Sequence, residues 1–102
     1  MLERAKQLIN DYCLAEYGGE ADFSDLSRVG LAYTTMGDDE LDVEIVADLE
    51  NPALLYYVDG NMVKREEYGS LEDMNAYALL WLDFDELYRT AMEAYDPWGE
   101  MI

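Results

Sequence analysis

The apolar positions at the start of the chain follow a helical period. They recur every three to four residues, which places one set of side chains on a single helix face: Leu2, Ala5, Leu8, Ile9, Tyr12 and Cys13. Gly18-Gly19 is expected to end this helix. The following segment, residues 20–27, is rich in turn-forming Asp and Ser. Its two apolar residues, Phe23 and Leu26, predict an ordered connection anchored to the core.

Four segments in the middle of the chain are typical of β-strands. Residues 29–35 are rich in β-formers, and in residues 41–49 apolar positions alternate with mostly acidic ones, which gives one apolar and one anionic face. A third strand begins at Ala53 and a fourth at Met62, with a tight hairpin signal, Asp59-Gly60-Asn61, between them. The short links favour an antiparallel meander.

Two helices are predicted after the strands. Ser70 fits an N-cap with an acid, Asp73, three residues later, and the helix that follows has a mixed apolar side: Leu71, Met74, Ala78, Leu79 and Leu82, flanked by Tyr77 and Trp81. Asp83 is expected to cap a last helix that Asp96-Pro97 ends. The chain, residues 1–102, therefore predicts one α+β domain: a four-stranded antiparallel meander with an N-terminal helix and two C-terminal helices packed on one face.

Composition agrees with one folded domain. The 102 residues can bury one modest core, and 51% are apolar, far from the signature of a disordered acidic tail. No apolar run approaches the roughly 20 residues that span a bilayer, and the N-terminus has no signal-peptide pattern. The single cysteine, Cys13, falls in a helical apolar pattern and reads as a buried hydrophobe. We expect a cytoplasmic protein.

The charge balance is the most informative feature of the composition. Six basic residues stand against 24 acidic ones, a formal charge of −18. Solubility alone needs a magnitude of only about 2 to 8 in a small domain, so the excess favours a cationic partner, bound metal ions or a salty habitat. Direct binding to nucleic acid or to an anionic membrane is disfavoured, because both select for Lys and Arg.

Catalysis and cofactor binding have little support. Without His, and with one cysteine, the chain lacks Ser-His-Asp, Cys-His and zinc arrangements. It also has no glycine-rich phosphate loop, so we expect no catalytic residue and no cofactor. Hard cations prefer carboxylates, yet neither residues 38–40 nor residues 83–86 continue into a calcium loop, and no specific metal site is predicted.

The sharpest candidate for partner binding is a run of acids without a basic residue: Asp38, Asp39, Glu40, Asp42, Glu44, Asp48 and Glu50. Alternate residues on a strand face lie about 6.6 to 6.8 Å apart, close to the roughly 6.8 Å that two steps of one DNA strand cover along the axis. Such a row could follow Arg or Lys side chains that are built to hold phosphates. The alternative is that these acids are the solvated face of an amphipathic strand.

A second stretch without basic residues covers residues 66–88. Most of its acids lie in helix first turns, where the helix dipole favours them, but Glu66 and Glu67 do not, and they join the candidate partner-binding residues. Several tyrosines are candidate interface anchors, although core positions are the favoured interpretation: Tyr56, Tyr57, Tyr68, Tyr77, Tyr88 and Tyr95. Trp98 becomes a candidate contact if the tail leaves it exposed.

Three segments resemble a known family: EYGGEADFSDLSRVGLAYTT (residues 16–35), YVDGNMVKREEYGSLEDM (57–74) and LDFDELY (82–88). The chain is similar there to large polyvalent protein-associated domains, small acidic modules of mobile-element proteins from Gram-positive gut bacteria. Residues 36–55 match this family least. The resemblance implies a phage, plasmid or conjugative origin, in which stand-alone acidic proteins act as counter-defence factors, including anti-CRISPR inhibitors. It adds no catalytic residue.

Three function hypotheses follow. The leading one is a non-enzymatic inhibitor that binds a basic nucleic-acid-binding protein or nuclease, such as a CRISPR effector, by nucleic-acid mimicry. The second is a protein-interaction or accessory module whose charge mainly provides solubility, and the third is a carboxylate-based divalent-metal-binding domain. Under the first, changing Asp42, Glu44 and Asp48 to Lys is expected to abolish binding and to leave the fold intact or more stable.

Overall fold

The described part of the chain folds as one helix, four consecutive strands and two further helices with a short 3-10 turn between them. The computed structural model describes residues 1–36 and 40–95, so Asp38, Asp39, the Asp96-Pro97 stop and Trp98 lie outside the described part. The bounds are α1 (Leu2–Tyr17), β1 (Val29–Met36), β2 (Leu41–Asp48), β3 (Ala53–Val58), β4 (Asn61–Glu67), α2 (Leu71–Tyr77), η1 (Leu79–Trp81) and α3 (Phe84–Tyr95).

The strands form the predicted antiparallel meander in the order β1-β2-β3-β4. The hairpin between β3 and β4 turns at Asp59 and Gly60, which have φ angles of 53° and 82°. Positive φ at both central residues is the geometry of a two-residue hairpin turn whose twist matches that of the strands, and glycine adopts it without strain. The Asp-Gly signal in the sequence therefore sets this register.

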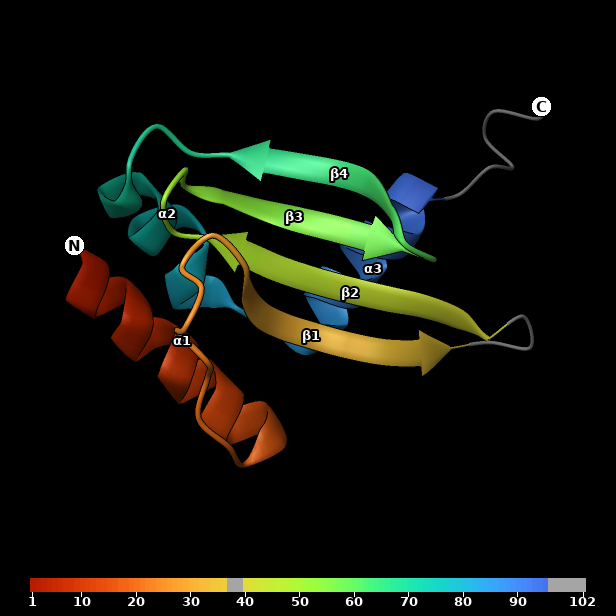
Figure 1. The fold of residues 1–102 in the computed structure, drawn as a ribbon, viewed down its shortest axis with the longest axis horizontal. Coiled ribbons are helices and arrows are strands. Elements are labelled where there is room, and N and C mark those ends of the chain that lie inside the picture. Colours follow the sequence, from red (N-terminus) through yellow and green to blue (C-terminus); the bar gives the residue numbers. More distant parts are fainter. Residues whose placement is uncertain (37–39, 96–102) are drawn as a thin grey trace.

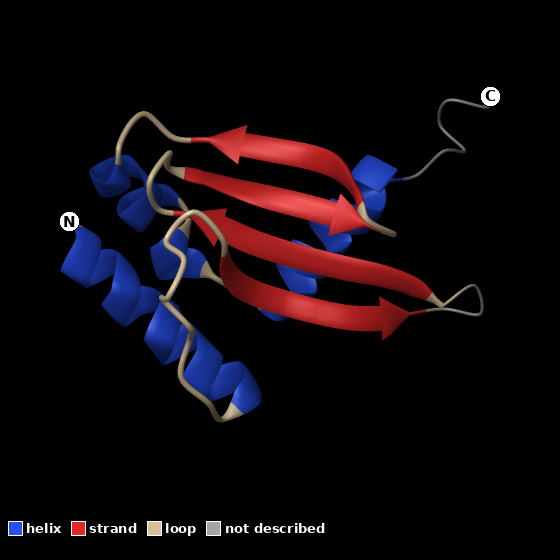
Figure 2. Cartoon of the chain, viewed as in Figure 1, coloured by secondary structure: helices blue, strands red, loops and turns tan. Residues whose placement is uncertain are grey.

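Two layers make up the molecule, as Figures 1 and 2 show. The sheet lies in front and the helices α2 and α3 lie behind it, with α1 on the β1 side. Helix α3 contacts all four strands, while α1 packs against α2 and η1. The α+β class and the placement of the helices on one face are thus confirmed. The other face carries no helix from residues 1–36 or 40–95, and we call it the open face.

Strand alternation decides which side chains reach the core. The main hydrophobic cluster contains alternate residues of β2 and β3 together with the buried faces of the helices. From the two strands it takes Val43, Ile45, Ala47, Leu54, Tyr56 and Val58. A second, smaller cluster lies on the open face, where Val46, Ala53 and Leu55 are buried and Tyr57 packs against them. The open face is therefore partly apolar.

The helix ends follow the predicted signals. Gly18 closes α1 with a φ of 71°, and its N–H donates to the Leu14 carbonyl (3.1 Å). The N–H of Asp73 donates to the Ser70 hydroxyl at the start of α2 (3.1 Å), and the N–H of Asp85 donates to Asp83 at the start of α3 (2.9 Å). Both predicted N-caps are confirmed.

One helix prediction was wrong in its extent. The apolar pattern of residues 71–82 predicts a continuous helix, but α2 ends at Tyr77, and Ala78 leaves the helical region with φ −131° and ψ −61°. The indole N–H of Trp81 donates to the Ala76 carbonyl (2.9 Å), which fixes the ring beside the break.

No helix in the described residues is long and apolar enough to cross a bilayer.

Candidate acidic and aromatic binding surfaces

The acids of β2 do not form a row of free carboxylates. Asp42 is exposed and accepts a hydrogen bond from the Thr35 hydroxyl (2.8 Å). Glu44, the next residue on the open face, is half-buried and pairs with the Arg28 guanidinium (2.7 Å). A basic residue from outside the strand therefore neutralises the middle of the predicted acidic face, which the run of acids in the sequence does not indicate.

The other two residues of that face, Val46 and Asp48, are buried and do not face solvent. Val46 is buried at 1% exposure. Asp48 is 8% exposed, and one of its carboxylate oxygens accepts the backbone N–H groups of Glu50 and Asn51, each at 2.9 Å. Asp48 stabilises the β2–β3 turn through these bonds. This speaks against the expectation that the fold stays intact when Asp42, Glu44 and Asp48 are changed to Lys, because the change at Asp48 would place a positive charge in a buried position and leave two N–H donors without their acceptor.

Two acids of the predicted run stay exposed at the ends of β2. Glu40 precedes the strand with a φ of 52°, and Glu50 follows it in the turn. Asp38 and Asp39 are outside the described residues, so the structure does not place them relative to Glu40. Along β2, the structure therefore brings together Asp42 and Glu44, whereas Glu40 and Glu50 lie at opposite ends of the strand.

Glu66 and Glu67 point to opposite sides of the sheet because they are neighbours on β4. Glu67 pairs with Ala53 in the register and lies on the open face, where its carboxylate accepts from the Arg65 guanidinium (2.7 Å). Glu66 pairs with Leu54 on the helix side, where it accepts the Tyr56 hydroxyl (2.6 Å). These two predicted site residues belong to different surfaces.

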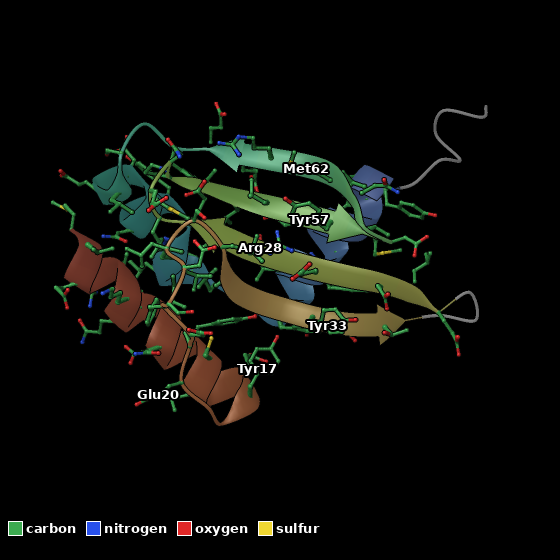
Figure 3. The ribbon with its side chains drawn as sticks, in the orientation of Figure 1. Tyr17, Glu20, Arg28, Tyr33, Tyr57 and Met62 are labelled. Carbon is green, nitrogen blue, oxygen red and sulfur yellow. The ribbon has the colours of Figure 1, made fainter. Side chains whose placement is uncertain are left out.

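The open face presents exposed aromatic and apolar side chains. Figure 3 shows Tyr33, Tyr57 and Met62 on the side of the sheet turned to the viewer, from β1, β3 and β4, with Arg28 among them. Tyr33 is 65% and Met62 is 52% exposed. The Arg28 guanidinium carbon lies 5.1 Å from the centre of the Tyr57 ring, so the same cation contacts both this ring and Glu44.

The helix side has a groove between the outer strand and the last helix. We call it the β4–α3 groove; its volume is about 170 Å³. Its lining includes two buried or half-buried rings, two exposed rings and two glutamates: Tyr56, Tyr68, Tyr77, Trp81, Glu66 and Glu86. Asp83 lines it as well, and Lys64 is the one basic residue among the described residues around it.

Two tyrosines of this groove, Tyr56 and Tyr68, have raised pKa values, and the Tyr56 hydroxyl donates a hydrogen bond to Glu66. Burial raises the pKa of Tyr56 far above its usual value, and the hydrogen bond to Glu66 and the negative charges of Glu66 and Glu86 act in the same direction. Burial, followed by the charge of Glu66, also raises the pKa of Tyr68. The groove therefore combines the neutral phenols of Tyr56 and Tyr68 with carboxylates.

A second groove lies between α1 and β1. It has a volume of about 380 Å³ and is mainly apolar, with Cys13, Tyr17 and Leu31 among its lining residues. Figure 3 shows Tyr17 and Glu20 on its α1 side and Tyr33 on its β1 side. Burial raises the pKa of the Cys13 thiol, which lowers the fraction of nucleophilic thiolate.

The described residues contain no cluster of three or more Cys, Asp or Glu side chains placed to hold a metal ion.

The prediction that the tyrosines are mostly core or half-buried residues is right for most positions: Tyr56 is buried and Tyr57, Tyr68, Tyr88 and Tyr95 are half-buried. Tyr77, at 74% exposure, is the exception.

Sequence reasoning missed the β4–α3 groove as a site. The sequence pattern places Trp81 only beside the apolar helix side and explains Glu86 by the helix dipole. The available signal was the spacing of Tyr77 and Trp81, two large rings four residues apart and outside the apolar stripe. What this spacing does not reveal is that β3 and β4 bring Tyr56 and Glu66 to the same place.

No family model, curated protein or solved structure matches this chain. The resemblance to large polyvalent protein-associated domains stays a prediction, and the assignment of function rests on the chemistry of the surfaces described above.

Proposed function

We propose that this protein is a non-enzymatic binding module that holds a basic segment of another protein. The supporting observation is the distribution of charge. Among the described residues, Asp48 is the one buried acid, and the three ion pairs between side chains engage only Glu3, Glu44 and Glu67. Most carboxylates therefore face solvent without a cation, and their summed potential attracts and orients a basic surface.

The partner we propose is a basic nucleic-acid-binding protein or nuclease, whose nucleic-acid site the module would occupy. With the family resemblance, this becomes a host defence nuclease inhibited by a mobile-element protein. The β2 spacing no longer supports a continuous copy of a phosphate row, because Val46 and Asp48 are buried and Glu44 is paired. Mimicry would instead arise from acids of different elements that share a surface, such as Glu66, Asp83 and Glu86 on the helix side.

A second function has an observation of its own. The exposed Tyr33 and Met62, beside the half-buried Tyr57, form an apolar surface on the open face, and aromatic and Met side chains are enriched in protein interfaces. An accessory module anchored through this surface would bind its partner with little dependence on salt. Salt dependence therefore separates the two functions.

The test is capture of partners on the immobilised protein at roughly 0.05 M salt, followed by stepwise elution up to about 1 M salt, where the Debye length falls to about 3 Å. The proposal predicts a basic nucleic-acid-binding protein that elutes at intermediate salt and that added duplex DNA displaces. Partners that remain bound at the highest salt and ignore DNA would contradict it and favour the accessory module.

A matched pair of variants then locates the contact. Glu40→Gln with Asp42→Asn removes two exposed charges from the start of β2, and Asp11→Asn with Glu16→Gln removes two exposed charges from α1. Both variants remove two negative charges, so the net charge of the chain changes equally in each. Weaker capture by the first variant alone would place the partner on the strand acids that the sequence singles out.

A further inference from the structure

The β4–α3 groove has the chemistry of a receptor for a cation. Its rings come from three separate parts of the chain, Tyr56 on β3, Tyr68 after β4, and Tyr77 and Trp81 around the break between α2 and η1. Aromatic faces attract cations through their quadrupole, and such rings together with carboxylates form the usual cage for an organic cation. Apolar ligands would gain nothing from the carboxylates.

Local contacts hold this arrangement in place. The Trp81 ring is 68% exposed, yet its indole N–H is fixed by the Ala76 carbonyl at 2.9 Å. The Tyr56 hydroxyl donates to one oxygen of Glu66 at 2.6 Å, and a carboxylate keeps further acceptor positions when one is used. A fixed exposed ring and an oriented carboxylate lower the entropy that binding costs.

The size of the groove sets the size of the ligand. At about 170 Å³ it is smaller than the roughly 300 to 1,000 Å³ of sites for drug-sized molecules. It is therefore suited to one side chain that enters from a partner. Glu66, Asp83 and Glu86 outnumber Lys64 by three to one around it, which makes the complementary side chain positive.

We propose that the β4–α3 groove receives a single arginine side chain from the basic partner, stacked on Trp81 and paired with Glu66 or Glu86. The inference rests on the proposed function and specifies its contact. Arginine is favoured over lysine because its planar guanidinium stacks on aromatic rings, donates in a fork that fits a carboxylate and is more weakly hydrated than an ammonium group.

Lys64 has a defined part in this site. It extends from β4 on the same side as Glu66 and opposite Tyr56 in the register, so its ammonium group repels an incoming cation. Removal of its charge by Lys64→Gln is expected to raise the affinity for an arginine ligand by about two- to five-fold at low salt, the range of a surface charge pair.

The experiment uses three short glycine-serine peptides with neutral ends that differ only in a central arginine, lysine or citrulline. Citrulline keeps the shape of arginine without its charge. Binding to the full chain is followed through the indole N–H signal of Trp81, which Trp81→Phe assigns. We expect the arginine peptide to shift this signal in a saturable way, the lysine peptide to bind more weakly and the citrulline peptide to leave it unchanged.

Two variants and one control test the residues. Trp81→Ala should weaken arginine binding by about three- to thirty-fold, the range of a cation–π contact, as followed by backbone amide signals around the groove. Glu86→Gln should weaken it by about two- to five-fold. Glu93→Gln, with the same charge change on the same helix but outside the groove, should have no effect. Unchanged backbone spectra elsewhere confirm that each variant is folded.

Each result separates this inference from the proposed function. If the arginine and citrulline peptides shift Trp81 alike, or if Trp81→Ala and Glu86→Gln bind as the unaltered chain does, the groove is not an arginine receptor. The proposed function still stands in that case if capture of a basic partner depends on salt. If capture does not depend on salt while the groove binds arginine, the proposed function fails, but the inference that the groove is an arginine receptor stands.

Discussion

Strand β2 and the β4–α3 groove both carry carboxylates, but they use them differently. On β2 the acids lie close together in the sequence, and the fold engages two of them: Asp48 stabilises a turn and Glu44 pairs with Arg28. In the groove, Glu66 and Glu86 are 20 residues apart in the sequence and lie beside aromatic rings. A run of like charges therefore does not locate a binding surface, whereas convergence of different elements can.

The largest effect that tests this contrast is expected at Asp48. Asp48→Ala leaves the N–H groups of Glu50 and Asn51 without their acceptor in a part-buried turn, and should lower the free energy of unfolding by about 1 to 3 kcal/mol. Asp42→Ala, which also removes one β2 carboxylate, should change it by less than about 0.5 kcal/mol. Urea unfolding measures both. Equal effects would show that Asp48 is no more structural than its neighbour.

The groove side of the contrast depends on Tyr56. Tyr56→Phe removes a hydroxyl that donates to Glu66 and should lower the free energy of unfolding by about 1 kcal/mol near neutral pH. Tyr33→Phe, at an exposed ring, is the control with no measurable effect. A loss of stability in Tyr33→Phe as large as in Tyr56→Phe would argue against a structural role for the Tyr56–Glu66 hydrogen bond.

The raised pKa of Tyr56 also predicts a dependence on pH. Above about pH 10 an unfolded tyrosine loses its proton while folded Tyr56 keeps it, so the unfolded state binds fewer protons and stability falls as the pH rises. Tyr56→Phe should therefore flatten part of this fall, and Tyr12, Tyr17, Tyr68 and Cys13, whose pKa values are also raised, should contribute to the remainder. Unfolding curves on either side of pH 10 measure the slopes.

Arg28 gives a test of similar size on the open face. Arg28→Ala removes the ion pair with Glu44 and the contact with the Tyr57 ring, which together should lower the free energy of unfolding by about 1 kcal/mol. Arg65→Ala breaks the ion pair with Glu67, whose carboxylate is more exposed than that of Glu44. It should lower the free energy of unfolding by about half as much or less. If the two variants are equally stable, the Arg28 contacts do not hold this face together.

The smallest effect is expected from charge reversal at the exposed end of β2. Asp42→Lys relieves like-charge repulsion in a chain of formal charge −18 and should raise the free energy of unfolding by about 0.5 kcal/mol at low salt. Because salt screens surface charges, the gain should vanish in concentrated salt. A gain that persists there would point to a packing effect in place of an electrostatic one.

Most of the fold follows from local patterns. The meander order, the Asp59-Gly60 turn and the caps at Gly18, Ser70 and Asp83 were all predictable, because each depends on residues that are close in the sequence. The break after Tyr77 was not, since the apolar pattern continues through it. There a backbone turn at Ala78 and a hydrogen bond from Trp81 interrupt the helix.

Local patterns are enough to predict the class of the fold, the core-facing side of β2 and the large excess of acids, because alternation, helical period and net charge are sums over local residues. Which acids are free is visible only in the folded chain. Arg28 reaches Glu44 from outside β2, and Glu66 accepts from Tyr56 and lines one groove with rings of α2 and η1. These contacts join residues that are separated in the sequence. The hydrogen bonds of Asp48 are local, but its burial depends on how the sheet packs.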